Sequence, residues 1–136
     1  MAGPMNIIIM GCGRVGAMLA RALVEEGHAV TMLDATQENL RRLPDHLGIA
    51  TMLGDGTLEE DLRRAGMEEA DVFVAVEERD SRNAMAAQKV RYLFGTSKVV
   101  CRISDPVRQE MYQKLGLETV SPTMMISAMI LEALHG

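Results

Sequence analysis

Aromatic residues and basic charge are both scarce in this sequence. Its 136 residues include no Trp, two Tyr and two Phe, so aliphatic side chains and twelve Met must fill the core. Acidic residues outnumber basic ones by 19 to 14, which leaves a formal charge of -5. That balance argues against broad electrostatic attachment to nucleic acid or to an anionic membrane, because both need a basic protein surface. If the protein binds an anionic ligand, a small local site and not a broad basic surface must therefore hold it.

Long apolar runs and clustered cysteines are also missing. No run approaches the ~18 residues that cross a bilayer, so we expect no direct membrane insertion. The first four residues lack the regions of a signal peptide and are set aside as a candidate cloning remnant or disordered segment. Cys12 and Cys101 are far apart and have no metal-ligand spacing, which favours buried thiols in a reducing cytoplasm.

Short apolar runs alternate with longer amphipathic segments along the chain. This pattern is typical of parallel strands joined by crossover helices. We expect strands at residues 6–10, 29–33, 49–53, 72–76, 99–103 and 119–120, with helices at 15–26, 38–43, 58–65, 81–94, 107–115 and 123–134. The pattern predicts one α/β domain over residues 5–136, a Rossmann-type three-layer sandwich. Its mainly parallel, six-stranded sheet should have an order near 3-2-1-4-5-6.

Residues that start and stop helices agree with these ranges. Thr57 and Glu60 have the spacing of a capping box, and Asp105 and Ser121 each stand before a proline where an N-cap belongs. Glycines occur where four of the helices should end, at Gly27, Gly66, Gly95 and Gly116.

A glycine-rich turn follows the first apolar run and opens the first predicted helix. It reads Gly11-Cys12-Gly13-Arg14-Val15-Gly16. The first glycine permits a tight turn, the second lets the backbone approach a phosphate, and the third lets the helix pack closely on the strand. Free N–H groups and the positive end of the helix dipole then attract the phosphate. Arg14 is a candidate phosphate contact, although a solvated surface arginine explains it equally well.

A carboxylate marks the end of the second predicted strand. Asp34, followed by Ala35, stands where an acidic residue accepts hydrogen bonds from both hydroxyls of a nucleotide ribose. It would repel a 2′-phosphate, which favours NAD(H) or ATP, ADP and AMP over NADP. The alternative is that Asp34 binds no ribose and only caps the following helix. The turn Gly54-Asp55-Gly56 follows the third strand at the same edge, near the expected adenine, and a turn with a helix cap also explains it.

The sequence lacks the usual catalytic motifs. No serine lies in a GxSxG elbow, no lysine follows a P-loop, and neither Tyr92 nor Tyr112 has a lysine four residues later. Cys12 near a helix N-terminus remains as an alternative redox thiol with a depressed pKa. The histidines have no partner at triad or metal-ligand spacing, so no catalytic or metal site is expected and they are most simply surface residues: His28, His46 and His135.

The last predicted helix is apolar around nearly its whole circumference. Only Ser127 and Glu132 are clearly polar positions in it. A helix of this kind must be covered on more than one side. We therefore expect its outer face to pack against a second chain in a homodimer or larger oligomer, through Met124, Met125, Ile126, Met129 and Ile130.

Further short motifs along the chain indicate more narrowly which class of protein this sequence resembles. After GCGRVG and Asp34 come GDGT at 54–57, LRRAG at 62–66, ADVFVAV at 70–76, Asn83, RISDP at 102–106, and a Gly-Leu pair at 116–117 that leads to Pro122. This order of motifs, from about Met5 to Leu134, resembles the nucleotide-binding N-terminal domain of potassium-transport regulators, called TrkA-N, KTN or RCK-N.

The resemblance implies a cytoplasmic regulator, peripheral to the membrane through a potassium transporter or channel, that binds NAD(H) or ATP/ADP and gates ion transport through changes in its own assembly. It implies that the glycine loop with Arg14 holds phosphate, that Asp34 holds ribose, and that the loop of Asp55 lies at adenine. The far side of the cleft would be lined by Val76, Glu77, Asn83 and Arg102.

Two departures from the family pattern stand out. Family members commonly continue into a second regulatory domain, so this chain is either a stand-alone subunit or an excised domain. Thr123 replaces an acidic residue that is frequent after Pro122. Two other interpretations stay open from the residues alone: an NAD-dependent oxidoreductase or its cofactor-binding fragment, and a structural domain that has lost its ligand.

Overall fold

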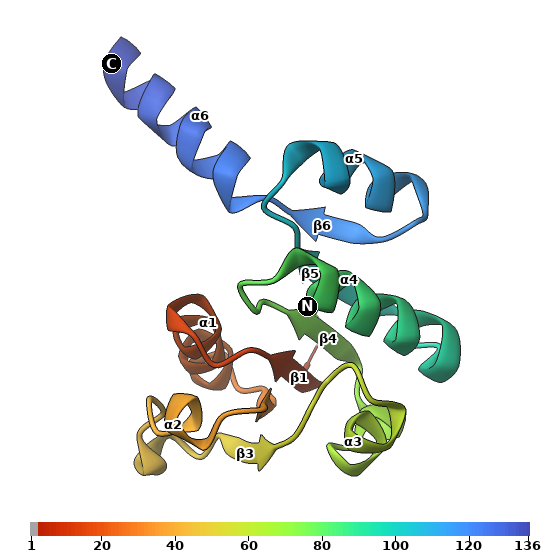
Figure 1. The fold of residues 1–136 in the computed structure, drawn as a ribbon. Coiled ribbons are helices and arrows are strands. Elements are labelled where there is room, and N and C mark those ends of the chain that lie inside the picture. The colour runs from red at the N-terminus through yellow and green to blue at the C-terminus, as the bar shows by residue number, and fades with distance from the viewer. Residues whose placement is uncertain (1–2) are drawn as a thin grey trace.

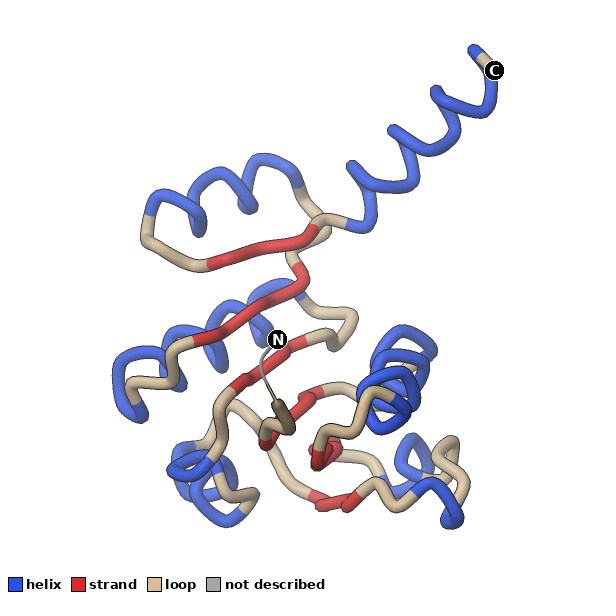
Figure 2. The backbone as a smooth tube through the Cα atoms, turned by 180° about the vertical axis from the view of Figure 1, so that it is seen from behind, coloured by secondary structure: helices blue, strands red, loops and turns tan. Residues whose placement is uncertain are grey.

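A six-stranded, all-parallel sheet forms the centre of the computed structural model, which describes residues 3–136 (Figures 1 and 2). The strands run in the order β3-β2-β1-β4-β5-β6, which confirms the predicted fold class. Residues 1–4 were set aside as a candidate cloning remnant or disordered segment, and the first two of them, Met1 and Ala2, lie outside the described residues. The strand bounds are β1 Asn6–Met10, β2 Ala29–Asp34, β3 Ala50–Leu53, β4 Val72–Ala75, β5 Lys98–Arg102 and β6 Glu118–Val120.

Helices cover the sheet on both faces. Helices α1 (Arg14–Glu25) and α2 (Gln37–Leu40) lie on one face, and α3 (Glu59–Arg64), α4 (Asp80–Lys89) and α5 (Pro106–Lys114) lie on the other (Figure 1). The last helix, α6, spans Pro122–His135. Short single turns complete the connections: the 3₁₀ segments Asp45–Leu47 and Met67–Glu69, and a π-helical turn, Val90–Phe94, that continues α4.

The two cores lie on opposite faces of the sheet because neighbouring residues of a strand point to opposite sides. In β1, Ile7 and Ile9 join the core under α1, whereas Ile8 and Met10 join the core under α3 and α4. Strands buried on both faces must be apolar without interruption, which explains why this strand reads as a continuous hydrophobic run.

Several local expectations were wrong. Thr57 does not cap α3, because its hydroxyl donates to Asp55 instead. His28 is buried rather than superficial, and its Nδ1 accepts a hydrogen bond from the backbone N–H of Met5. The helix expected over 81–94 changes from α to π at Val90. The caps by Asp105 and Ser121 were confirmed.

Helix α6 projects away from the sheet and its flanking helices (Figure 1). No residue of α6 is buried within this chain, so neither of its faces packs on the sheet. This corrects the expectation that one face of α6 would lie against the domain and only the outer face would remain free. None of the described helices combines the length and the hydropathy that a bilayer crossing requires.

Candidate functional site

A cleft of about 920 Å³ opens at the carboxyl ends of the strands. It lies where the strand order reverses between β1 and β4, which is the usual ligand site of an open parallel sheet. The loops that follow β1, β2, β3 and β4 supply most of its walls. The end of β5 and the start of α4 complete them. Its lining residues are Gly11, Cys12, Gly13, Arg14, Val15, Asp34, Ala35, Thr36, Asn39, Arg42, Asp55, Val76, Glu77, Glu78, Arg79, Arg82 and Arg102.

The glycine loop joins β1 to α1 along one wall of this cleft. Gly11 has a φ of +113°, a conformation that side chains other than glycine rarely adopt. Gly13 is the N-cap of α1, and no side chain caps the helix there. The first N–H groups of α1 are therefore left for a ligand, at the positive end of the helix dipole. This arrangement is typical of anion-binding helix starts.

Asp34 connects the end of β2 to that loop. Its Oδ2 accepts from the N–H of Cys12 at 2.8 Å, and its Oδ1 accepts from the N–H of Thr36 and from Nδ2 of Asn39. An ionised carboxylate offers about four acceptor positions. Three are already used, so Oδ2 has capacity for one further donor such as a ribose hydroxyl. A second hydroxyl could bond only if the 3.2 Å contact with Asn39 were released.

Arg82 links the third and fourth loops of the cleft. Its guanidinium pairs with Asp55, at 2.8 Å from Nη2 to Oδ1, and with Glu77, at 2.7 Å from Nε to Oε1. The bond to Glu77, more than the bond to Asp55, raises the pKa of Arg82. Burial alone would raise the pKa of Asp55, but hydrogen bonds from Thr57 and Arg82 outweigh it and lower that pKa. The Asp55 carboxylate and the Arg82 guanidinium therefore carry opposite charges near neutral pH.

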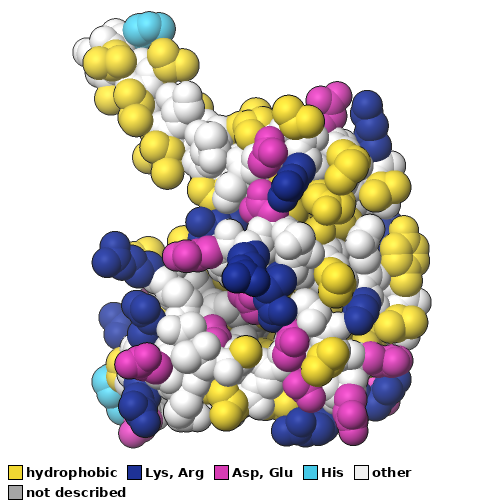
Figure 3. All heavy atoms as spheres, viewed as in Figure 1, with side chains coloured by type: hydrophobic (Ala, Val, Ile, Leu, Met, Phe, Trp, Pro, Cys, Tyr) yellow, Lys and Arg dark blue, Asp and Glu magenta, His cyan; other side chains and the backbone are white. Residues whose placement is uncertain are grey.

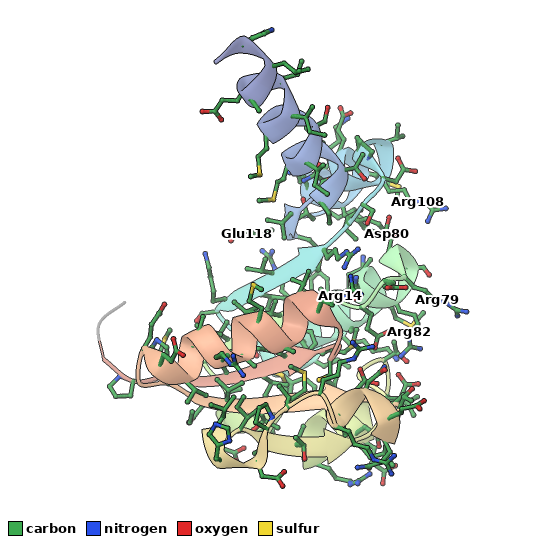
Figure 4. The ribbon with its side chains drawn as sticks, turned by 90° about the vertical axis from the view of Figure 1, so that its left-hand side faces the viewer. Arg14, Arg79, Asp80, Arg82, Arg108 and Glu118 are labelled. Carbon is green, nitrogen blue, oxygen red and sulfur yellow. The ribbon has the colours of Figure 1, made fainter. Side chains whose placement is uncertain are left out.

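Positive charge gathers in the cleft although the protein is acidic. Five arginines line it against four carboxylates. Arg82 is ion-paired, whereas the other four have no ion-pair partner among residues 3–136, and the Nε of Arg102 is buried without a hydrogen-bond acceptor. Arg14, Arg79 and Arg82 lie at the same end of the sheet (Figure 4). Such an arrangement attracts anionic ligands.

Four residues expected at the site do not line the cleft. A Cβ on Gly16 would lie 1.9 Å from the carbonyl oxygen of Gly11, so Gly16 serves the contact between α1 and the loop. Gly56 lies close to Met10, and Gly54 packs near Leu33. Asn83 is fully buried and supports two lining residues: its Oδ1 accepts from the N–H of Glu77, and its Nδ2 donates to the carbonyls of Glu77 and Arg102.

The alternative of a reactive thiol at Cys12 is wrong. The side chain is fully buried, and burial, together with the charge of Asp34, raises the pKa of the thiol rather than lowering it. A protonated, inaccessible thiol is a poor nucleophile. No cluster of three or more His, Cys, Asp or Glu side chains within residues 3–136 is arranged to hold a metal ion.

Six lining residues were missed from the sequence: Thr36, Asn39, Arg42, Glu78, Arg79 and Arg82. Thr36, Glu78 and Arg79 follow a strand within a few residues, so the rule that parallel sheets bind ligands at their carboxyl ends already contained a signal for them. No comparable signal existed for Arg42 or Arg82. Their place in the cleft depends on how α2 and α4 are turned relative to the sheet.

Fold and cleft together define a Rossmann-type domain with a site for an anionic ligand. The TrkA-N domain model matches residues 7–122, and the chain belongs to this family. It is 46% identical over 117 residues to the Trk system potassium uptake protein TrkA of Streptomyces coelicolor, covering 86% of this chain and 52% of that protein. It is 32% identical over 111 residues to a TrkA homologue of Pyrococcus abyssi, with 82% and 49% covered. The chain thus spans about half the length of these relatives.

Solved structures share the fold. The TrkA-N domain of the Escherichia coli inner membrane protein ybaL has a TM-score of 0.85 at 18% identity, covering 98% of this chain and 99% of that one. The Kef C-terminal domain of Shewanella denitrificans in AMP-bound form has a TM-score of 0.83 at 22% identity, with 96% and 80% covered. The GsuK channel bound to NAD has a TM-score of 0.72 at 22% identity, with 89% and 22% covered.

Proposed function

We propose that this chain is the nucleotide-binding regulatory unit of a potassium uptake system or channel. The observation that carries the proposal is the cleft itself. It is lined by the uncapped start of α1, by four arginines that have no ion-pair partner within residues 3–136, and by Asp34 at the end of the neighbouring strand. Phosphate and ribose are the two ligand groups that this combination fits. The family match supports the regulatory assignment, because the relatives are named as Trk potassium uptake proteins.

The proposed ligand is an adenine nucleotide, NAD(H) or ATP, ADP or AMP. Asp34 disfavours NADP, since a 2′-phosphate would approach a carboxylate that is almost fully buried. The neighbours with bound AMP and NAD carry those ligands on the same fold. The charged groups of the cleft are arginines and carboxylates, with its one thiol held protonated, so we propose that the site binds its nucleotide and catalyses no reaction.

We further propose that the unit acts within an assembly, on the cytoplasmic side of a membrane transporter or channel. Helix α6 carries exposed apolar side chains along its length (Figure 3). An isolated helix of this length is marginal in water, so a second copy of the chain is the proposed cover for it. Nucleotide binding would then favour one arrangement of the copies over another, by its difference in affinity for the two.

Hydrogen bonds supply a physical connection between the cleft and the base of α6. Asp80 follows the cleft residue Arg79, and its carboxylate accepts from the N–H groups of Ser104 and Asp105. The carbonyl of Ser104 in turn accepts from the hydroxyl of Ser121, whose Oγ accepts from the N–H of Met124 and so caps α6. Through these hydrogen bonds, a shift of the loop after β4 would change the direction in which α6 projects.

Native mass spectrometry of the purified protein tests the proposal, because it reports subunit number and the mass of any retained nucleotide together. Calorimetric titration with ADP and NAD then compares Arg14→Met with Arg21→Met, two turns further along the same helix and outside the cleft. We expect Arg14→Met to weaken ADP binding about tenfold, as the loss of one charged contact does, and Arg21→Met to leave it unchanged. A folded protein that binds no adenine nucleotide would rule the proposal out, as would turnover of nicotinamide with a small carbonyl substrate.

A further inference from the structure

Arg82 is the only side chain that ties together the loops after β3 and β4 by ion pairs within residues 3–136. Its two partners, Asp55 and Glu77, belong to different loops of the cleft, and all three side chains are partly buried, with exposed fractions between 18% and 32%. Two turns further along α4, Nζ of Lys89 donates to the carbonyl of Thr57, which belongs to the loop after β3. One face of α4 thus holds the loop that contains Asp55.

The two oxygens of the Asp55 carboxylate are in different states. Oδ1 accepts three hydrogen bonds, from the N–H of Thr57 at 2.9 Å, from its hydroxyl at 2.7 Å, and from Nη2 of Arg82 at 2.8 Å. Oδ2 accepts none from residues 3–136, and Asp55 lines the cleft. An ionised carboxylate oxygen can only accept, so this cleft-lining side chain keeps one acceptor, Oδ2, that no donor within residues 3–136 uses.

The position of that acceptor corresponds to the base of a bound nucleotide. The glycine loop follows β1, Asp34 is the last residue of β2, and Asp55 lies just after β3, which is the next strand in the same direction. With phosphate at the first loop and ribose at the second, the base falls near the third. An acceptor there bonds the exocyclic amino group of adenine. Hypoxanthine carries a carbonyl oxygen at that place, so the acceptor repels it.

We propose that Arg82 is a positioning residue that sets the base selectivity of the cleft. The inference rests on the proposed function, since it needs a nucleotide in the site. Thr57 fixes the carboxylate within its own loop, but Arg82 alone attaches it to the opposite wall. That attachment fixes how far Oδ2 lies from a base whose phosphate and sugar are anchored elsewhere. It also gives both carboxylates an ion-pair partner, which reduces the negative charge of this cluster from two to one.

Titration calorimetry with ADP and IDP tests this role, because the two ligands differ only in the base. We expect the wild-type chain to prefer ADP by about tenfold or more, the value of one hydrogen bond to a charged group. Arg82→Met should reduce that preference to about threefold or less. Arg82→Lys should give an intermediate ratio, because one ammonium group cannot reach both carboxylates as the planar guanidinium does. Arg108→Met, which removes an arginine of α5 away from the cleft, is the matched control (Figure 4).

Asp55→Asn provides a second, independent variant. The amide oxygen should take the place of Oδ1, since all three donors there require an acceptor, and this puts the NH₂ group where Oδ2 was. A donor now faces the base, so we expect the preference to invert toward IDP. Should Arg82→Met fail to fold, the Arg82→Lys and Asp55→Asn ratios decide the matter.

The possible results separate the two proposals. Wild-type protein that binds neither ADP nor IDP contradicts the proposed function, and the role of Arg82 falls with it. Wild-type protein that binds both equally contradicts only the base selectivity. If Arg82→Met weakens ADP and IDP by the same factor, Arg82 contacts the phosphate instead, and the positioning role is wrong.

Discussion

At the scale of single residues, the glycines of the loop after β1 have separate physical tasks. Gly16 is needed for packing, because any side chain there would collide with the carbonyl of Gly11. Gly13 has φ of -89°, which other residues adopt easily, and open space where a Cβ would be. The fold itself therefore does not require glycine at Gly13.

Gly16→Ala and Gly13→Ala should consequently affect different properties, the first the stability of the fold and the second the binding of ADP. We expect Gly16→Ala to lower the free energy of unfolding by about 3 kcal/mol, as forced overpacking against backbone does. Gly13→Ala should leave stability nearly unchanged and weaken ADP binding at least about tenfold, because its methyl group occupies the approach of the phosphate. Urea unfolding and calorimetry on both variants check this, and equal effects on stability would contradict it.

The buried thiols make stability depend on alkaline pH. Burial raises the pKa of Cys101 from 9.0 to about 11. The folded state thus favours the protonated thiol, and the stability that this provides is complete below pH 9.0 and is lost as the pH rises toward 11. Urea unfolding across that range should show the loss in the wild-type chain and a smaller one in Cys101→Ala. Rapid alkylation of either thiol in the native protein near neutral pH would contradict this account.

At the scale of elements, the first turn of α4 organises the carboxyl end of the sheet. Within that turn, Asp80 holds the loop after β5, Arg82 holds the loop after β3, and Asn83 holds the ends of β4 and β5. Buried polar groups need such partners, because an unpaired buried donor or acceptor is expensive. The π-helical turn that follows, Val90–Phe94, lies at the other end of this helix and takes no part in the site.

Asn83→Leu tests this role of α4. The substitution keeps the branched shape and the number of side-chain heavy atoms but leaves the N–H and carbonyl of Glu77 and the carbonyl of Arg102 without their partner. We expect a loss of about 2–4 kcal/mol in the free energy of unfolding by urea. Ser81→Ala, on the exposed side of the same turn, should stay within about 0.5 kcal/mol of wild type. An Asn83→Leu variant as stable as Ser81→Ala would show that the bonds contribute little.

Local patterns explain what was predictable in these elements. The strand order, the glycine loop and the helix caps at Asp105 and Ser121 follow from short-range signals in the sequence, and the structure has them. Arg82 and the support by Asn83 depend on contacts between segments that are distant in sequence, so no local pattern indicated them. The capping box at Thr57 failed for a local reason instead, since the hydroxyl donates to the Asp55 carboxylate two residues earlier in the chain.

At the scale of the whole molecule, α6 is the feature that a single chain leaves incomplete. Its apolar side chains are half or more exposed, and Val120 on the edge strand β6 is exposed beside its base. Exposed apolar surface of this extent usually marks an interface. A sequence pattern could indicate that the helix needs cover, but not that the helix would leave the domain altogether.

Charge placed on α6 should therefore disrupt self-association. We expect the wild-type chain to sediment as a dimer or larger assembly at micromolar concentration, and Ile126→Asp combined with Ile130→Asp to sediment as a monomer. Ser127→Asp introduces the same kind of charge at a polar position between them and should remain associated. A wild-type chain that is monomeric both with and without ADP would contradict the role given to α6.

Titration of ¹⁵N-labelled protein with ADP, followed by amide NMR, tests whether the cleft between β1 and β4 binds a nucleotide through the glycine loop and Asp34. We expect saturable shifts that begin at Gly11, Cys12, Gly13 and Ala35, and extend to the loop of Asp55. A spectrum of folded protein that does not change with ADP or NAD, or that changes only at residues outside the cleft such as Leu43 and Thr51, would rule out this binding site.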